Sequence, residues 1–131
     1  MEPFKPQNKD DLVNAVNGFI NNGEGENGHI SEWDVSLIVN MSFLFDGKTS
    51  FNEDLGDWDV SEVTTMEGMF RNARAFDQDI GDWNVGKVKS MKEMFDGAES
   101  FNNDGGKIND WDLGSVTTLE GMFRGALEFN R

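Results

Sequence analysis

Four tryptophans recur along the chain at nearly constant spacing, and this regularity constrains the fold more than any other feature of the sequence. They are separated by 25, 25 and 28 residues: Trp33, Trp58, Trp83 and Trp111. The last spacing is longer because Gly105-Gly106-Lys107 forms what we interpret as a three-residue insertion. A fixed period of roughly 20–50 residues is typical of arrays in which each unit buries its apolar face against its neighbours.

Apolar residues occupy the same places around every tryptophan. Aligned on the tryptophans, nine columns of four residues cover 36 positions, of which 35 are apolar, with Lys48 as the exception. The columns around Trp83 contain Ile80, Val85, Val88, Met91, Met94, Phe95, Ala98 and Phe101. Such a pattern predicts one continuous apolar core. The alternative, an aromatic surface that stacks on carbohydrate, needs these side chains to be exposed.

Each period also carries local signals for a helix and a strand. The spacing of Met66, Met69, Phe70 and Ala73 is that of one face of a helix of about two turns. Residue types that cap helices flank it in every period: Asn40, Thr65, Ser90 and Thr118 before it, and Gly47, Asn72, Gly97 and Gly125 after it. The alternating Trp-x-Val pair indicates a short strand. We therefore predict an α/β solenoid of leucine-rich-repeat-like coils, with the strands on its concave side.

The first 29 residues depart from this pattern and predict a cap. Asn8 is a candidate N-cap, and one apolar stripe follows it: Leu12, Ala15, Val16, Phe19 and Ile20. A helix there is expected to cover the open end of the array, and Asn21–Gly28 to act as a connector. The predicted organisation is a capping helix and connector over 1–29 and a four-coil array over 30–131, together one domain.

The other end of the array has no comparable cap in the sequence, which ends within a coil at Phe129-Asn130-Arg131. The final coil therefore leaves apolar residues without a following unit: Leu119, Met122, Phe123 and Phe129. An uncovered apolar patch commonly marks an interface. The sequence thus predicts a two-fold, tail-to-tail homodimer through residues 116–131.

The unit FNEDLGDWDVSEVTTMEGMF, followed by FDQDIGDWNVGKVKSMKEMF, resembles the 26-residue bacterial surface protein repeat. This BspA-like family of unknown function is related to leucine-rich repeats and is common in mycoplasma lipoproteins. The resemblance covers residues 30–131, and the opening FKPQNKDDLVNAVNGFI is similar to the segment that often precedes such arrays. It implies display at the cell surface or secretion, interaction with proteins or host cells, and no catalytic residues.

Composition excludes several classes of function. The chain has no cysteine and one histidine, His29, so it offers neither a thiolate site nor a multi-histidine metal centre. Its formal net charge of −14 argues against binding to nucleic acid. No apolar run reaches the roughly 18–20 residues that span a bilayer, and the N-terminus has no signal-peptide pattern. We expect a non-enzymatic protein without a cofactor and without membrane insertion.

Two acidic columns flank the tryptophans and form the candidate binding site. If each tryptophan points into the core, its neighbours point outward: Glu32, Asp34, Asp57, Asp59, Asp82, Asn84, Asp110 and Asp112. Rows of like charge indicate a positive partner, either a protein with a basic surface or a cation such as Ca²⁺, which prefers oxygen ligands. The alternative is a solvated acidic face whose carboxylates accept hydrogen bonds from neighbouring turns.

A further acidic column contains Asp54, Asp79 and Asp104, beside a polar column of Asn52, Asp77, Asn102 and Asn130. We interpret these residues as turn formers that satisfy backbone groups, as asparagine ladders do. Paired carboxylates also serve in glycoside hydrolysis, but a pair repeated in every coil defines no unique site. The function we expect is therefore a protein-interaction module with an acidic face. The alternatives are a structural protein that binds divalent cations and a saccharide-binding protein.

Overall fold

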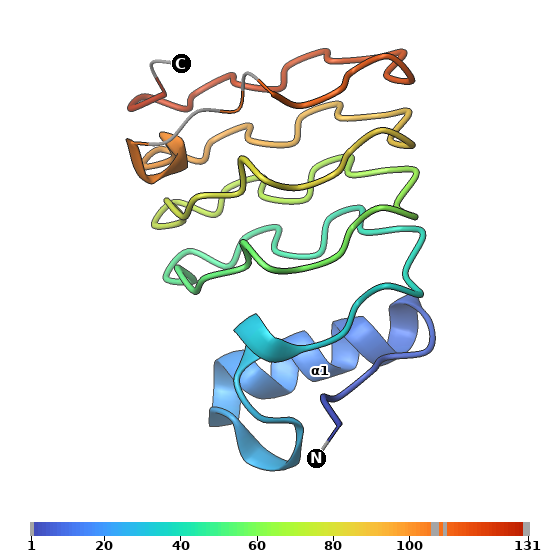
Figure 1. Cartoon of the computed structure of the whole chain (residues 1–131). Helices are drawn as coiled ribbons and strands as arrows, with labels where there is room; N and C mark the ends of the chain where they lie inside the picture. Colours follow the sequence, from blue (N-terminus) through green and yellow to red (C-terminus); the bar gives the residue numbers. More distant parts are fainter. Residues whose placement is uncertain (1, 106–107, 109, 130–131) are drawn as a thin grey trace.

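The computed structural model describes residues 2–105, 108 and 110–129. Its regular elements are helix α1 (Lys9–Asn22) and three short 3₁₀ turns, η1 (Gly25–Asn27), η2 (Ile30–Glu32) and η3 (Asn103–Gly105). From residue 30 onward the chain winds in stacked layers (Figure 1). We number the layers one to four by the tryptophan that each contains, from Trp33 to Trp111.

Helix α1 forms where its sequence signals predict it. The Asn8 side chain accepts a hydrogen bond from the Asp11 backbone N–H at 2.9 Å, which satisfies one of the free donors of the first turn. The helix ends at Gly23, whose φ of 82° lies in the left-handed region and whose N–H bonds the Phe19 carbonyl. Leu12 and Val16 are buried and Ala15 and Phe19 pack against the core, so most of the predicted apolar stripe faces the stack, whereas Ile20 is 39% exposed.

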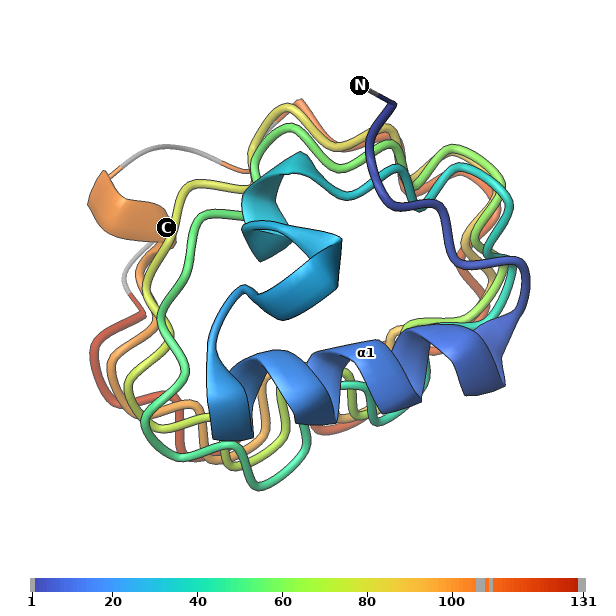
Figure 2. The ribbon, with the colours of Figure 1, turned by 90° about the horizontal axis from the view of Figure 1, so that it is seen from below.

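The N-terminal segment covers one end of the stack, as predicted. Figure 1 shows α1 below the layers, and Figure 2 shows it lying across their end together with the N-terminal segment that precedes it. Phe4 and Phe19 pack edge-on against Trp33, with ring centroids 5.2 and 6.0 Å away. The Lys9 ammonium also donates to the Ser42 hydroxyl at 2.8 Å, so apolar and polar contacts both hold the cap.

The predicted α/β solenoid of leucine-rich-repeat-like coils is wrong. In the described part of the chain, α1 is the only α-helix, and the layers are built of turns. They contain no strand either, but only isolated parallel bridges from Asn40 to Thr65, from Thr65 to Ser90 and from Ser90 to Thr118. A concave face lined by strands is therefore absent from these residues. The array of strand–helix coils is replaced by turns that bond from layer to layer.

Backbone dihedral angles explain why the helical spacing does not produce helices. In every layer one residue near the start of the expected helix has positive φ: Phe43 (57°), Gly68 (59°), Glu93 (57°) and Gly121 (67°). A right-handed helix cannot pass through such a residue. The predicted left-handed residues at its end are confirmed: Gly47, Asn72, Gly97 and Gly125 have φ of 75°, 57°, 76° and 72°.

Hydrogen bonds between layers take the place of helical ones. In layer one the N–H groups of Met41, Phe43, Phe45 and Gly47 donate to layer-two carbonyls at 2.8–3.0 Å. These four donors are alternate residues and all point toward the next layer. The Phe43 ring fills the space that a Cβ atom at Gly68 would occupy. A larger residue at position 68 would have to displace this ring and would also have to adopt the positive φ of 59°.

Aromatic side chains form the centre of the stack. In layers two to four the tryptophan indole N–H donates to a backbone carbonyl of the preceding layer: Trp58 to Ile30, Trp83 to Leu55 and Trp111 to Ile80, at 2.8, 2.8 and 3.1 Å. Two columns of phenylalanines stack in parallel, one through Phe45, Phe70, Phe95 and Phe123 and the other through Phe51, Phe76, Phe101 and Phe129. The prediction that these columns form the core, rather than a surface for carbohydrate, is confirmed.

The final layer is less well buried than the alignment predicts. Leu113 and Leu119 are exposed although they occupy apolar columns, because no layer follows them among the described residues. Just before the insertion, Asn103 is fully buried, accepts from the Ile80 N–H at 2.8 Å and donates to Asp79 at 3.1 Å. Gly106 and Lys107 of the insertion and Asn130 of the polar column lie outside the described residues.

Candidate functional site

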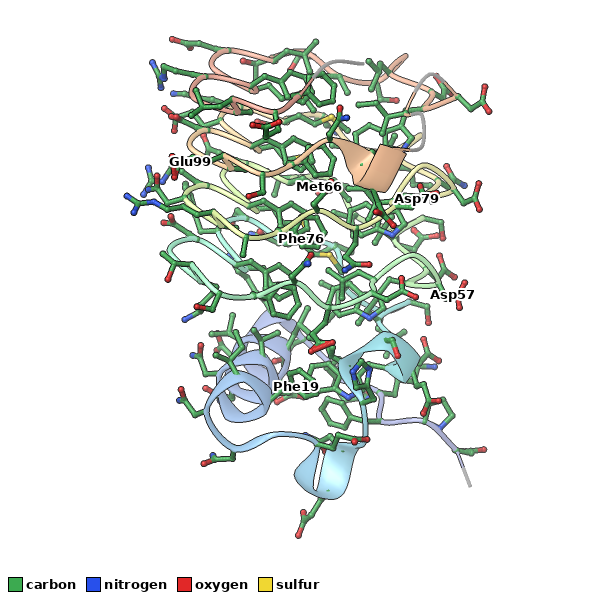
Figure 3. The ribbon with its side chains drawn as sticks, turned by 90° about the vertical axis from the view of Figure 1, so that its left-hand side faces the viewer. Phe19, Asp57, Met66, Phe76, Asp79 and Glu99 are labelled. Carbon is green, nitrogen blue, oxygen red and sulfur yellow. The ribbon has the colours of Figure 1, made fainter. Side chains whose placement is uncertain are left out.

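The residues that precede the tryptophans form a row of exposed carboxylates, which we call the acidic row. It consists of Glu32, Asp57, Asp82 and Asp110, all of them exposed. Figure 3 shows Asp57 at the outer edge of the stack, far from Met66 and Phe76 in its interior. None of the four side chains forms a hydrogen bond or ion pair with another described residue. The acidic row is therefore available to a partner.

The residues that follow the tryptophans behave differently, because they close turns. Asp34 and Asp59 each accept from the backbone N–H and the hydroxyl of the serine two residues later, at 3.0 and 2.6 Å. Asn84 and Asp112 accept from the N–H groups of Gly86 and Gly114 at 3.0 and 2.9 Å. For this half of the candidate site, the alternative interpretation of turn-forming side chains is supported.

These hydrogen bonds change the acidity of two carboxyl groups. The Ser36 hydroxyl, and then the Ser36 N–H, lower the pKa of Asp34 below its ordinary value, with Lys5 adding a smaller effect of the same sign. Ser61 lowers the pKa of Asp59 in the same way, although the neighbouring Asp34 charge opposes it. For both carboxyl groups, the hydrogen bond from the serine hydroxyl is the largest cause of the shift.

We expect the pKa of Asp59 to rise toward its ordinary value when Ser61 is replaced by alanine. The serine hydroxyl stabilises only the charged carboxylate, so its loss removes the largest cause of the shift. Because the folded-state pKa is lowered, the stabilisation from Asp59 is present above the unfolded pKa and is lost as pH falls through the folded one. An NMR titration of the Asp59 carboxyl carbon in both proteins measures this. An equal pKa in the two proteins would contradict the assignment.

A second polar surface, on another side of the layers, pairs opposite charges. The Arg71 guanidinium donates two hydrogen bonds to Asp46 in the layer before it, at 2.9 and 3.2 Å, and lies 3.9 Å from Glu93 in the layer after it. Arg124 in turn pairs with Asp96 at 2.9 Å and with Glu93 at 3.0 Å. We call this alternating column the charge ladder. The charge ladder was not predicted from the sequence, although the signs alternate at the position that directly follows each phenylalanine of the first column.

The other polar columns have structural roles. The Asn52 amide oxygen accepts from the Asp77 N–H at 2.8 Å, and the Asp77 carboxylate accepts from the N–H groups of Asn102 and Asp104, also at 2.8 Å. Asp54 and Asp79 accept from the glycines two residues later. The interpretation of these residues as turn formers is confirmed for Asn52, Asp54, Asp77 and Asp79.

His29 and the acidic side chains do not assemble a metal site in the described residues. The His29 ring bonds the Ser31 hydroxyl at 2.7 Å and lies 3.2 Å from Glu53, which places it at the junction of the connector and layer two. Within the described ranges, no group of three or more His, Asp or Glu side chains is arranged to hold a metal ion. Among the same residues, no helix is long and apolar enough to cross a membrane.

The chain matches a known protein family over most of its length. Residues 13–131 match a family described as "Mycoplasma protein of unknown function, DUF285". The match includes most of α1 and all four layers. No curated protein and no solved structure matches the chain.

Proposed function

The chain belongs to the DUF285 family of Mycoplasma proteins of unknown function, and on that premise we propose that it is a protein-interaction module whose acidic row binds a partner with a basic surface. The observation that carries the proposal is the contrast between two sets of charges. Among the described residues, the acidic row has no basic residue paired with it, whereas Arg71, Lys87 and Arg124 are paired with acids elsewhere on the layers.

Electrostatics supports a basic partner. The four carboxylates belong to successive layers that hydrogen-bond to one another, so they form a column of like charge on a protein with a net charge of −14. A column of one sign attracts opposite charge and raises the rate of association, with an effect that falls as salt is added. The binding we propose is therefore fast and sensitive to salt.

We also propose that this interaction takes place at the bacterial cell surface. The support is the resemblance of the layer sequence to the bacterial surface protein repeat, with its BspA-like and lipoprotein members. The matched family is itself described only by its Mycoplasma source and unknown function. Labelling intact cells with an antibody against the chain tests this, and signal only after lysis would contradict it.

We expect the double substitution of Asp57→Lys with Asp82→Lys to weaken binding of an oligolysine peptide by roughly tenfold or more, which is about 1.4 kcal/mol. The matched control is Glu24→Lys with Glu26→Lys, which changes the net charge equally in the exposed connector. Fluorescence anisotropy at several salt concentrations measures both. An equal loss in the two variants would show that net charge alone attracts the peptide.

The alternative, a structural protein that binds divalent cations, is distinguished by thermal unfolding with Ca²⁺ and with EDTA. A cation at about 100 times its Kd stabilises the folded protein by roughly 2.7 kcal/mol. If the acidic row binds a basic protein, Ca²⁺ and EDTA leave the melting temperature unchanged. A rise with Ca²⁺ that Asp57→Asn abolishes would favour the cation-binding alternative.

A further inference from the structure

The end of the stack opposite α1 exposes a row of backbone donors. Figure 1 shows layer four there, with no described segment beyond it. In layer three the N–H groups of Met91, Glu93, Phe95 and Gly97 donate to layer four at 2.7–3.1 Å. The equivalent N–H groups of layer four have no hydrogen-bond partner within the described residues: Leu119, Gly121, Phe123 and Gly125. We call them the donor row.

The polarity of the donor row follows from the backbone conformation. Gly121 and Gly125 have φ of 67° and 72°, and their left-handed conformation turns the N–H groups of alternate residues to the same side of the chain. Consecutive right- and left-handed residues are known to align donors in this way. The edge of layer four formed by these residues therefore offers hydrogen-bond donors, and its natural complement is a row of carbonyl oxygens.

The two-fold, tail-to-tail dimer predicted from the sequence does not supply that complement. A two-fold axis that brings the two rows together places donors opposite donors. An N–H group that loses water without gaining an acceptor costs about 1–3 kcal/mol. The apolar residues of the final layer favour association, but the donor row opposes it with an identical surface. A partner that presents carbonyl oxygens would accept hydrogen bonds from the donor row and would also cover the apolar residues of the final layer.

Side chains at the same face extend the columns of the stack. Phe123 and Phe129 stack at 4.0 Å on each other, and each also stacks on a phenylalanine of layer three. Leu119 and Leu127 are 45% and 73% exposed beside them. A layer of the same type placed here would continue both aromatic columns and bury these leucines.

The charge ladder specifies which kind of layer fits. Arg71 is held by Asp46 from the layer before it and approached by Glu93 from the layer after it. Within the described part of the chain, the partners of Arg124 are Asp96 and Glu93, both in the layer before it. The Arg124 side chain is 64% exposed, so an acidic residue from a following layer would complete the pattern seen around Arg71.

We propose that the face of layer four binds a segment of a second polypeptide that has the sequence pattern of layer three. Such a segment presents the carbonyls that already accept hydrogen bonds from layer two, those of Ser90, Lys92, Met94 and Asp96. It also places an acidic residue against Arg124 and a phenylalanine against Phe123. The partner is thus a polypeptide that adds a layer, and its binding is independent of the acidic row.

The test uses the whole chain and a synthetic peptide with the sequence of residues 87–101. We expect one peptide to bind per chain and to slow hydrogen exchange at the donor row, at Leu119, Gly121, Phe123 and Gly125. Exchange at Met91 and the other layer-three donors, which are already bonded, should not change. A scrambled peptide that protects the same four amides would overturn the proposal.

Matched variants separate docking from loss of folding. Leu119→Lys should weaken binding of the peptide at least tenfold, whereas Leu37→Lys should not, since Leu37 is equally exposed, at 45%, in layer one. A peptide with Glu93→Lys should also bind more weakly, because it presents a lysine to Arg124. The proposal fails if Leu119→Lys binds normally while remaining folded. It also fails if light scattering shows that the chain alone dimerises with the donor row protected.

Discussion

Replacing Trp83 with alanine is expected to lower the free energy of unfolding by about 3–5 kcal/mol, the range for deleting a large buried aromatic side chain. Trp83 is 3% exposed, and its ring lies 6.3 Å from Phe70. Its indole N–H also donates to the Leu55 carbonyl of the preceding layer at 2.8 Å. The substitution therefore removes packing and an interlayer hydrogen bond together. Chemical denaturation monitored by circular dichroism measures the loss.

Trp83→Phe separates these two contributions. It keeps most of the aromatic volume but removes the indole N–H, so we expect a loss clearly smaller than that of Trp83→Ala. Under the same conditions, a loss below about 1 kcal/mol for Trp83→Ala would mean that the tryptophans contribute little to the core. The carbohydrate-stacking alternative would then have to be reconsidered despite the burial.

The apolar core was predictable from the sequence because its columns repeat. A position that is apolar in every period, such as that of Trp58 and Trp83, is buried in successive layers for the same reason. The prediction failed at the end of the stack. Leu113 and Leu119 occupy apolar columns too, but the described residues provide a neighbouring layer on one side only, and both side chains are exposed. The alignment shows which side chains face inward and cannot show what covers them.

The local structure of the layers was not predictable in the same way. The spacing of Met66, Met69 and Phe70 fits one face of a helix, and it fits equally a turn that directs the same residues inward. What decides between the two is the positive φ at Gly68. In layers one and three the equivalent residues are Phe43 and Glu93, which rarely adopt this conformation. Hydrogen bonds to the next layer stabilise it, and no local propensity encodes them.

The capping helix was predictable because its signals are local. Asn8 accepts the hydrogen bond expected of an N-cap, and Leu12 and Val16 are buried at helical spacing. The candidate site was predictable only in part. The exposure of Asp57 follows from its place beside a buried tryptophan, whereas the turn that Asp59 closes depends on the serine at position 61. The two acidic columns therefore look alike in sequence and differ in structure.

Replacing Phe95 with alanine is expected to lower the free energy of unfolding by about 3–5 kcal/mol, because it interrupts an aromatic column in the middle of the stack. Phe95 is fully buried, and its ring stacks on Phe70, Phe101 and Phe123 at centroid distances of 5.5, 4.0 and 5.6 Å. Removing it leaves a cavity that borders layers two and four. Equilibrium unfolding in denaturant, with hydrogen exchange at individual amides, measures the loss and its location.

Phe123→Ala is the matched control, because Phe123 occupies the same column at the end of the stack. Its ring is only partly buried and stacks on Phe95 and Phe129 alone among the described residues. We therefore expect a smaller loss, with faster exchange confined to the layer-three amides that donate to layer four, such as Phe95 and Gly97. Equal losses for the two variants would mean that layer four is as well covered as layer three, and the open face on which layer addition depends would not exist.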